Sequence, residues 1–319
     1  MIKLTVNESE SNQTLEKYVK KALKEAPLSF IYKLFRKKDI KVNGHWQKEK
    51  YIIASGDEIS IYITDVQLDE FRKKNITKNS EDVTSYIVYE DENILIINKP
   101  RGIVVQEDGV NNSPLSQMVL SYLIEKKEYD PSKDLGYSPA PVHRLDRNTA
   151  GLVIFGKNIE TLQAFSKIIN DKSLIEKRYL TLVKGELKGE KEINAPLFKN
   201  SKTGMVSVST MGKEAITRYK VIDSFNGFSL LEVSLLTGRT HQIRVHMAYN
   251  NSPIIGDSKY GDYALNKEIE NKYSFKNQFL VAFYIKFHEL DGKLKYLSNK
   301  SFKIDLPDEL NSLLLKLRG

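Results

Sequence analysis

The chain has 319 residues, of which 40% are hydrophobic and 28% are charged, a composition typical of a globular protein. It contains no cysteine, which excludes disulfides, thiolate metal ligands and a cysteine nucleophile. The N-terminus lacks the apolar run of a signal peptide, and no stretch approaches the roughly 18 apolar residues of a membrane span. We therefore expect a soluble, cytoplasmic protein with one large and one small domain.

The net charge of +8 is concentrated near the N-terminus. Eleven Lys/Arg and four Asp/Glu lie between Thr14 and Lys50, so this segment carries +7. Apolar spacing predicts a helix over residues 15–23, capped by Thr14 and ended by Pro27, and a second helix capped by Ser29. Four basic residues of the second helix lie mostly off its apolar stripe: Lys33, Arg36, Lys37 and Lys38. Such a run is usually a solvated face, but its one-sided charge favours a polyanionic partner.

Short strand signals follow the basic helix. Ile40-Lys41-Val42 alternates into Asn43-Gly44, a pair typical of tight hairpin turns, and residues 51–63 predict more strand around Gly56-Asp57. This order of elements resembles the S4 RNA-binding domain over about fifty residues. The resemblance implies an S4-like domain over residues 1–65 whose Lys33, Arg36, Lys37 and Lys38 approach an RNA backbone. Such contacts depend on salt and carry little sequence information.

The remainder of the chain mixes strands and helices. Residues 66–84 are polar and predict a linker, and residues 85–319 form the larger predicted domain. Within it the apolar pattern predicts these elements in chain order: strands 86–89 and 94–97, helix 115–126, strand 152–155, helix 160–171, strands 179–183, 216–222 and 228–236, and helix 240–249. Because no regular β-α-β period is present, we expect an α+β fold.

Asp146 stands out because it lies between Arg144 and Arg147, just before the strand over residues 152–155. An acid in such a position is most often part of a structural salt bridge. Alternatively, the neighbouring cations keep a functional carboxylate ionised. Tyr179, on a later predicted strand, is by its sequence alone a packed strand tyrosine.

Several other chemistries are not supported by the sequence. His241 and His246 are five residues apart, which is poor spacing for one metal ion on a helix face, and no ligand helix completes the set. There is no Gly-x-Ser-x-Gly nucleophile elbow and no phosphate-binding Gly-x-x-x-x-Gly-Lys-Ser/Thr loop. We therefore expect no metal and no cofactor.

Five segments together resemble the RluA-type pseudouridine synthases, in the branch that acts on large-subunit ribosomal RNA. In family order they are 98–102, His143-Arg144-Leu145-Asp146 with Thr149 and Gly151, Lys177-Arg178-Tyr179, 237–246, and Gly256-Asp257 with Tyr260-Gly261. They spread over most of residues 85–290. The resemblance implies a mixed, mainly antiparallel sheet flanked by helices, which isomerises uridine in RNA without a cofactor.

The resemblance also implies the roles of individual residues. Asp146 is the essential carboxylate, which either attacks C1′ or removes a proton from the sugar. Arg244 is its ion-pair partner, and Tyr179 lies against the uracil with its hydroxyl available for proton transfer. Arg144 helps to flip the target base, and His143 and Arg239 join it as substrate contacts.

Three alternatives are set against this interpretation. The substrate is large-subunit ribosomal RNA or, alternatively, transfer RNA, and the S4-like unit favours the former only modestly. A non-catalytic RNA-binding assembly factor is the second alternative, although a retired site has no need to keep Asp146, Tyr179 and Arg244 together. Glycosidase-like hydrolysis needs a second carboxylate, which is not evident near these motifs. We expect a monomer with no obligate protein partner and no contact with a membrane.

Overall fold

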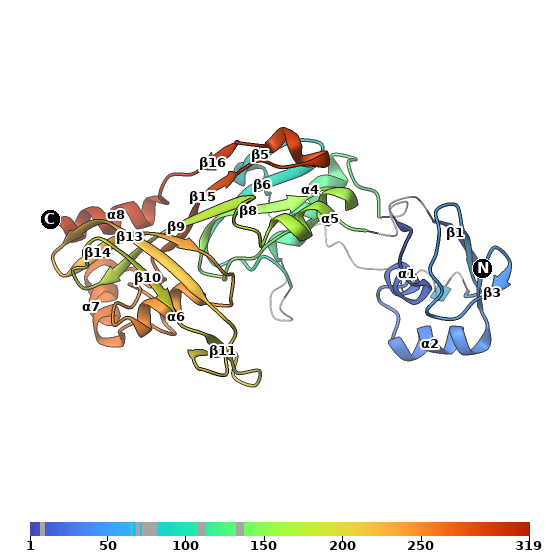
Figure 1. Cartoon of the computed structure of the whole chain (residues 1–319), viewed down its shortest axis with the longest axis horizontal. Helices are drawn as coiled ribbons and strands as arrows, with labels where there is room; N and C mark the ends of the chain where they lie inside the picture. The colour runs from blue at the N-terminus through green and yellow to red at the C-terminus, as the bar shows by residue number, and fades with distance from the viewer. Residues whose placement is uncertain (7–9, 65, 68–70, 72–81, 108–112, 132–136) are drawn as a thin grey trace. The chain divides into compact units, whose positions relative to one another are not determined.

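The structure is a computed structural model that describes residues 1–6, 10–64, 66–67, 71, 82–107, 113–131 and 137–319 (Figure 1). The chain divides into two compact units. The first comprises Met1–Asp82, Gln117–Ala140 and Lys157–Glu160, and the second comprises Val83–Ser116, Pro141–Gly156 and Thr161–Gly319. Most of the linker predicted over 66–84 lies outside the described residues. In the described part of the chain, every helix is too short or too polar to cross a lipid bilayer.

The N-terminal part of the first unit is a small antiparallel sheet with two helices. The strand order is β1-β4-β2-β3, with bounds β1 (Ile2–Thr5), β2 (Ile40–Val42), β3 (His45–Trp46) and β4 (Glu58–Ile61). The helices are α1 (Leu15–Ala22) and α2 (Leu28–Lys37). Their apolar faces share one buried core with the inward side chains of the strands. This arrangement is consistent with the S4-like unit predicted from the sequence.

Local signals in this unit explain its turns and caps. The Thr14 hydroxyl accepts a hydrogen bond from the Lys17 backbone N–H, which confirms the predicted cap of α1. Asn43 and Gly44 both have positive φ, and their hairpin joins β2 to β3 as predicted. The cap predicted at Ser29 is wrong. Helix α2 begins at Leu28 after Pro27, whose restricted φ of −55° suits a helix start.

The second unit is built on one large sheet. Its strand order is β10-β13-β14-β9-β15-β8-β6-β5, with β7 paired to β8 and β16 paired to β15. The pairings along this order and that of β16 with β15 are antiparallel, except the short parallel contact between β15 and β8. The strands are β5 (Ile87–Glu90), β6 (Ile94–Lys99), β7 (Ala140–Pro141), β8 (Ala150–Gly156), β9 (Ile175–Lys184), β10 (Glu190–Asn194), β13 (Ile216–Phe225), β14 (Phe228–Leu235), β15 (Leu280–Phe287) and β16 (Ser301–Lys303), with a separate hairpin of β11 (Leu197–Lys199) and β12 (Val206–Val208). The expected α+β fold with a mixed, mainly antiparallel sheet is confirmed.

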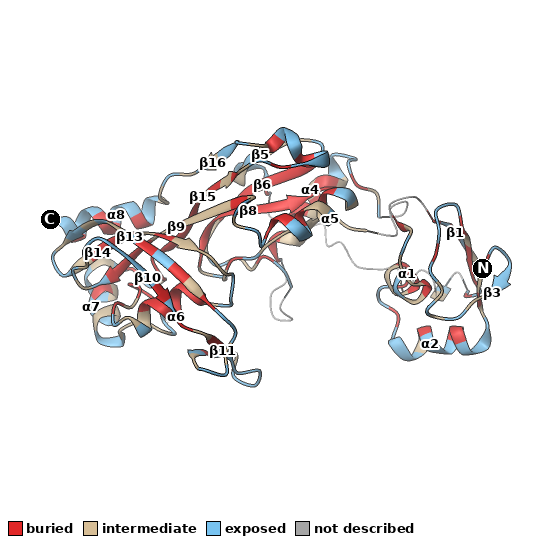
Figure 2. Ribbon diagram, in the orientation of Figure 1, coloured by how far each residue is buried: buried red, intermediate tan, exposed pale blue. Residues whose placement is uncertain are grey.

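Short helical segments complete the rest of the chain. They are η2 (Thr84–Tyr86), α4 (Leu115–Glu125), α5 (Ile159–Ile168), α6 (Gln242–Tyr249), α7 (Tyr263–Tyr273), η3 (Gly292–Leu297) and α8 (Asp308–Arg318). Every residue of β8 is buried, and the buried colour of Figure 2 follows this strand and its neighbours β6 and β15. Helix α5 packs against one part of this core, and α7 and α8 pack against another. The sheet is therefore a rigid platform for the loops that leave its strands.

Candidate active site

Asp146 lies in the tight loop between β7 and β8. The Thr149 backbone N–H donates to the Asp146 carbonyl at 3.1 Å, which closes the turn. The carbonyl of Arg147 accepts from the Gly102 N–H and from the Lys99 ammonium, each at 3.0 Å. The loop is thus tied to the segment that follows β6, so the backbone beneath the Asp146 side chain is held on both sides.

Lys99 anchors this arrangement from within the protein. Its side chain is fully buried, and Nζ donates to the carbonyls of Pro100, Ile103 and Arg147 at 2.8, 2.9 and 3.0 Å. Burial lowers the pKa of Lys99 to about 7, and the charge of Asp146 opposes that shift. Because three carbonyls match the three N–H donors of an ammonium group, the geometry favours the charged form.

Gly151 lets the loop enter the sheet. It has φ of +119° and pairs with Ala282 where β8 meets β15 in parallel register. A Cβ atom at this position would lie 2.2 Å from the Ala282 carbonyl oxygen, so any larger residue would push the two strands apart. The absence of a side chain at Gly151 therefore allows β8, which follows the Asp146 loop, to lie close to β15.

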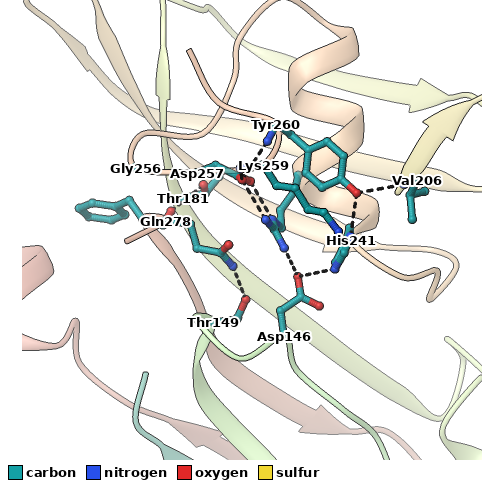
Figure 3. A network of polar contacts seen from close by, with 12 residues as sticks. Asp146, Thr149, Thr181, Val206, His241, Gly256, Asp257, Lys259, Tyr260 and Gln278 are labelled. Atoms are coloured by element: carbon teal, nitrogen blue, oxygen red, sulfur yellow. Dashed lines mark hydrogen bonds and ion pairs between the residues drawn. The ribbon is translucent and has the colours of Figure 1, made fainter. Parts of the chain in front are cut away.

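The Asp146 carboxylate is held by Arg244, as predicted, although nearly a hundred residues separate them. Arg244 Nη1 donates to Asp146 Oδ2 at 2.8 Å (Figure 3). The same guanidinium donates through Nε and Nη2 to the two oxygens of Asp257, at 2.7 and 2.8 Å. The side chains of Asp146, Arg244 and Asp257 are 26%, 8% and 1% exposed. A buried arginine thus links a fully buried acid to one that reaches solvent.

The charges in this chain stabilise one another. Burial alone would lower the pKa of Arg244, but its hydrogen bonds and charge contacts with Asp257 and Asp146 raise it. Burial alone would raise the pKa of Asp257, yet the Arg244 guanidinium and the backbone N–H groups of Lys259 and Tyr260 hold it below its usual value. Asp257 is therefore an anion at neutral pH, and it orients Arg244 towards Asp146.

Helix α6 carries Arg244, and polar side chains secure its first turns. Gln242 donates to the Ile216 carbonyl and the Thr217 hydroxyl, both at 3.0 Å. One turn later, buried His246 contacts the same Thr217 hydroxyl at 2.8 Å and the Ala195 carbonyl at 2.9 Å. These bonds fasten one face of α6 to β13. The helix begins at Gln242, two residues after the predicted start, because His241 adopts a left-handed conformation.

His241 faces the same oxygen of Asp146 as Arg244 does. Its Nε2 lies 3.9 Å from Asp146 Oδ2, and its Nδ1 lies 2.8 Å from the Tyr260 hydroxyl (Figure 3). That hydroxyl accepts the Val206 backbone N–H at 3.1 Å, so its own hydrogen is free to donate to Nδ1. Burial lowers the pKa of His241, against the opposing charge of Asp146. The neutral ring then carries its hydrogen on Nε2, directed at Asp146.

Asp146 Oδ1 has a different environment from Oδ2. The hydrogen bond from Arg244 and the facing edge of His241 both converge on Oδ2. In Figure 3 the dashed contacts of Asp146 meet at one carboxylate oxygen, and within the described residues the other oxygen has no hydrogen bond or ion pair. The carboxylate is therefore held through one oxygen and presents the other, an arrangement that suits attack on carbon or removal of a proton.

Tyr179 lies on β9, where it pairs with Ala282 of β15 and Val233 of β14. Its side chain is buried. Burial, followed by the nearby charge of Asp146, raises its pKa. The hydroxyl therefore keeps its proton at neutral pH and is a donor beside the carboxylate. Of the three residues predicted as catalytic, Asp146 and Arg244 form an ion pair, and Tyr179 lies near enough for the charge of Asp146 to affect its pKa.

The predicted substrate contacts have different surroundings. Arg144 is exposed and, within the described residues, has no hydrogen-bond or ion-pair partner. Arg239 is exposed, although its Nε donates to the Glu214 carbonyl at 2.9 Å. His143 is half-buried, its Nε2 accepts the Ile154 backbone N–H at 3.2 Å, and burial lowers its pKa well below the usual value. The ring of His143 is therefore already engaged with β8.

The four predicted contacts on the basic helix belong to the first unit. All of them are exposed: Lys33, Arg36, Lys37 and Lys38. The first three lie on α2, and Lys38 follows in a left-handed conformation that ends the helix. They form the charged outer side of the S4-like unit.

Sequence reasoning did not assign roles to Asp257, Tyr260 or Lys99, although all three lie in segments that carry the resemblance. Asp257 follows two isoleucines and Gly256, whose added Cβ would lie 2.2 Å from the Asn277 carbonyl. An acid inside such an apolar, tightly packed segment needs a buried cation as its partner. The apolar residues around Asp257 in the sequence could therefore have predicted a buried ion pair. Within the described residues, no group of three His, Asp or Glu side chains is arranged to hold a metal ion.

Comparisons with known proteins identify the family of the chain. A family model described as RNA pseudouridylate synthase matches residues 93–249. An uncharacterized RNA pseudouridine synthase of Mycoplasma capricolum is 36% identical, over 94% of this chain and 96% of its own length. The ribosomal large subunit pseudouridine synthase C of Haemophilus influenzae is 34% identical, over 99% of this chain and 94% of its own. That of Escherichia coli K12 is 33% identical, over 89% of this chain and 88% of its own.

A solved structure has the same fold. The human RNA pseudouridylate synthase domain containing 4 covers 74% of this chain and 94% of its own, with a TM-score of 0.59 and 20% identity.

Proposed function

The chain belongs to the RNA pseudouridylate synthase family, and we propose that it isomerises uridines to pseudouridines in large-subunit ribosomal RNA. The ion pair between Asp146 and Arg244 is the observation that carries the catalytic assignment, because it orients the carboxylate through Oδ2 and leaves Oδ1 without a hydrogen bond from the described residues. The ribosomal substrate is supported by the two relatives named as large-subunit enzymes, which match the chain over most of its length.

The reaction rearranges a nucleotide without adding or losing atoms. The bond from C1′ to N1 breaks, the uracil turns, and a bond from C1′ to C5 forms. The hydrogen on C5 is then lost as a proton, and N1 gains one. No electrons leave the substrate, so every step can be supported by groups that hold charge or move protons. Asp146, through Oδ1, either attacks C1′ or takes a proton from the sugar while stabilising positive charge there.

Arg244 and Asp257 keep Asp146 reactive in this scheme. A carboxylate that becomes enclosed by substrate loses the water that stabilises its negative charge. The guanidinium on Oδ2 offsets that loss, and His241 adds an N–H directed at the same oxygen. Because these groups are oriented before substrate arrives, little reorganisation is needed during the reaction.

Tyr179 and Arg144 act on the base in this proposal. The reacting atoms of a stacked or paired uridine are inaccessible, so the nucleotide must first leave its stack. Arg144, exposed two residues before Asp146, is suited to stack against bases or to fill the gap that the nucleotide leaves. The protonated Tyr179 hydroxyl lies against the uracil and assists proton transfer. The enzyme would act as a cytoplasmic monomer without a cofactor.

The test is isomerisation by the purified full-length protein. Transcripts of large-subunit ribosomal RNA, small-subunit ribosomal RNA and transfer RNA are incubated separately with it, and pseudouridines are mapped. We expect product at defined positions of the large-subunit transcript only. Product in transfer RNA alone would show that transfer RNA, and not large-subunit ribosomal RNA, is the substrate. No product in any of these RNAs would favour a non-catalytic assembly factor. Mapping RNA from cells with and without the protein then identifies the modified uridines.

A further inference from the structure

In the N-terminal unit, the S4-like part of the first unit, the described helices α1 and α2 pack on only one face of the small sheet. Strand residues alternate between the two faces, and the inward ones, such as Ile40, Ile59 and Ile61, pack in the core shared with α1 and α2. We call the opposite side the outer sheet face. It is formed by Lys3, Lys41, Trp46 and Tyr62, with the buried Ser60 between the lysines.

Strand register places these side chains in one row. Lys41 is directly opposite Trp46 on β3 and Ser60 on β4, and Ser60 is opposite Lys3 on β1. Tyr62 follows two residues after Ser60 and so returns to the same face. Trp46 is 40% exposed and Tyr62 is 44% exposed. Two large aromatic rings therefore lie at the surface of one small sheet.

Each ring has a lysine above it. Lys38 Nζ lies 5.3 Å from the centre of the Trp46 ring, and Lys41 Nζ lies 5.1 Å from the centre of the Tyr62 ring. Lys38 is also the residue that ends the basic helix α2. It therefore makes the outer sheet face continuous with the basic residues of that helix, including Arg36 and Lys37.

The chemistry of this face selects its partner. A surface that only contacts phosphates needs lysines but no exposed rings, and a surface that docks a protein is normally poor in lysine at its centre. Exposed rings interleaved with lysines match the requirements of an unpaired nucleotide, whose base stacks while its phosphate is neutralised. The surrounding segment, which carries +7 between Thr14 and Lys50, adds long-range attraction for a polyanion.

We propose that the outer sheet face binds single-stranded RNA by stacking unpaired bases on Trp46 and Tyr62, with Lys38 and Lys41 on the adjoining phosphates. This inference rests on the proposed function only in taking RNA as the partner. It gives the N-terminal unit a preference for unpaired segments, which backbone contacts from α2 alone do not provide.

Trp46 is the only tryptophan of the chain, so its fluorescence reports this face alone. The full-length protein is titrated with a single-stranded RNA oligonucleotide, a fully paired RNA duplex of the same length, and inorganic polyphosphate. Excitation is at a wavelength that tyrosine does not absorb, and binding is followed independently by anisotropy of end-labelled RNA. We expect strong quenching by the single strand, and much weaker quenching by duplex or polyphosphate at equal occupancy.

Variants separate stacking from charge. Trp46→Ala and Tyr62→Ala are each expected to weaken single-strand binding by roughly five-fold or more, while Trp46→Phe, which keeps a ring, restores most of the affinity. Tyr263→Ala, which removes an exposed tyrosine of α7, is the matched control and should bind like the parent protein. Thermal unfolding confirms that each variant is folded.

The proposal is overturned if the single strand binds without changing Trp46 emission, or if Trp46→Ala binds as tightly as the Tyr263→Ala control. Failure of the proposed function gives a different result, since wild-type protein would then make no pseudouridine in any RNA while quenching of Trp46 by single-stranded RNA persists.

Discussion

The basic residue that holds Asp146 is buried in the candidate active site, but those on helix α2 of the S4-like unit are exposed. Arg244 is buried, and three of its donors are committed to two named carboxylates at 2.7–2.8 Å. The basic residues of α2, among them Lys33 and Arg36, are exposed. A buried charge without its partners is strongly unfavourable, so the fold must hold it in one geometry. Exposed charges contribute little individually and act mainly through the total charge of the surface. The first region should therefore fail when one residue changes, and the second should fail gradually.

The largest expected effect comes from removing the buried cation. Arg244→Met leaves Asp257 as an unpaired buried anion and Asp146 without its partner, so we expect a loss of about 3–5 kcal/mol in the free energy of unfolding and no detectable isomerisation. Urea unfolding and pseudouridine formation measure the two effects. Arg218→Met, which breaks the exposed pair with Glu192, is the matched control and should change stability by less than about 1 kcal/mol. Equal losses of stability and activity in the two variants would contradict the proposed difference between buried and exposed basic residues.

A smaller effect is expected from the hydroxyl that orients His241. Tyr260→Phe leaves both Nδ1 of His241 and the Val206 N–H without their partner, which costs about 1 kcal/mol in stability and lowers the isomerisation rate by roughly ten-fold. The rate should also become more dependent on pH near neutrality, because the Tyr260 hydroxyl no longer stabilises the neutral form of His241 by donating to Nδ1. Tyr263→Phe, on the exposed side of α7, provides the comparison. A Tyr260→Phe enzyme with the parental rate and pH profile would show that His241 plays no part in holding Asp146.

Exposed charges should change binding but not chemistry. Replacing Lys33, Arg36, Lys37 and Lys38 together by Ala is expected to weaken RNA binding, and to reduce the slope of log affinity against log salt by roughly 3 for single-stranded RNA. The turnover rate at saturating RNA should stay unchanged. Lys303 and Lys316, exposed on β16 and α8, offer a control pair for replacement. An unchanged salt slope would make the α2 face only a solubilising surface.

The smallest expected effect is an acid dependence of stability. Arg244 holds the pKa of buried Asp257 below its usual value, against the effect of burial. A depressed folded-state pKa adds stability above the unfolded pKa of about 4, and this contribution is lost as pH falls through the folded value. The Asp257→Asn variant lacks this contribution, because an amide does not titrate. The difference in unfolding free energy between the parent protein and Asp257→Asn should therefore shrink from about pH 7 to about pH 3, and a constant difference would contradict the linkage.

Much of the fold was predictable because its signals are local. Thr14 as a cap, Asn43-Gly44 as a turn and the apolar run of β8 each depend on a few neighbouring residues. Helices α7 and α8 and strand β15 were not predicted, although α8 has buried leucines at helical spacing (Leu310, Leu313, Leu314 and Leu317) and β15 is an apolar run. Ser29 failed as a cap because the proline two residues earlier already provides a suitable helix start.

The candidate site divides in the same way. Asp146, Tyr179 and Arg244 were found through segments that resemble a family, whereas their distances depend on how β9, α6 and the Asp146 loop meet. The periodicity and composition of the sequence do not predict how these three elements are arranged in space. Asp257, Tyr260 and Lys99 lay in the same segments without an assigned role, because each acts through a partner that only the folded chain brings close. Positioning residues are therefore harder to assign than the groups that they position.

The most direct test of the central claim is the turnover of Asp146→Asn. RNA labelled with tritium at C5 of uridine releases tritium when pseudouridine forms, so single-turnover release with excess enzyme measures the chemistry itself. Asp305→Asn, which changes an exposed acid, serves as the control. We expect no release by Asp146→Asn, with RNA affinity close to that of the parent, and normal release by Asp305→Asn. Appreciable release by folded Asp146→Asn would show that another group performs the reaction.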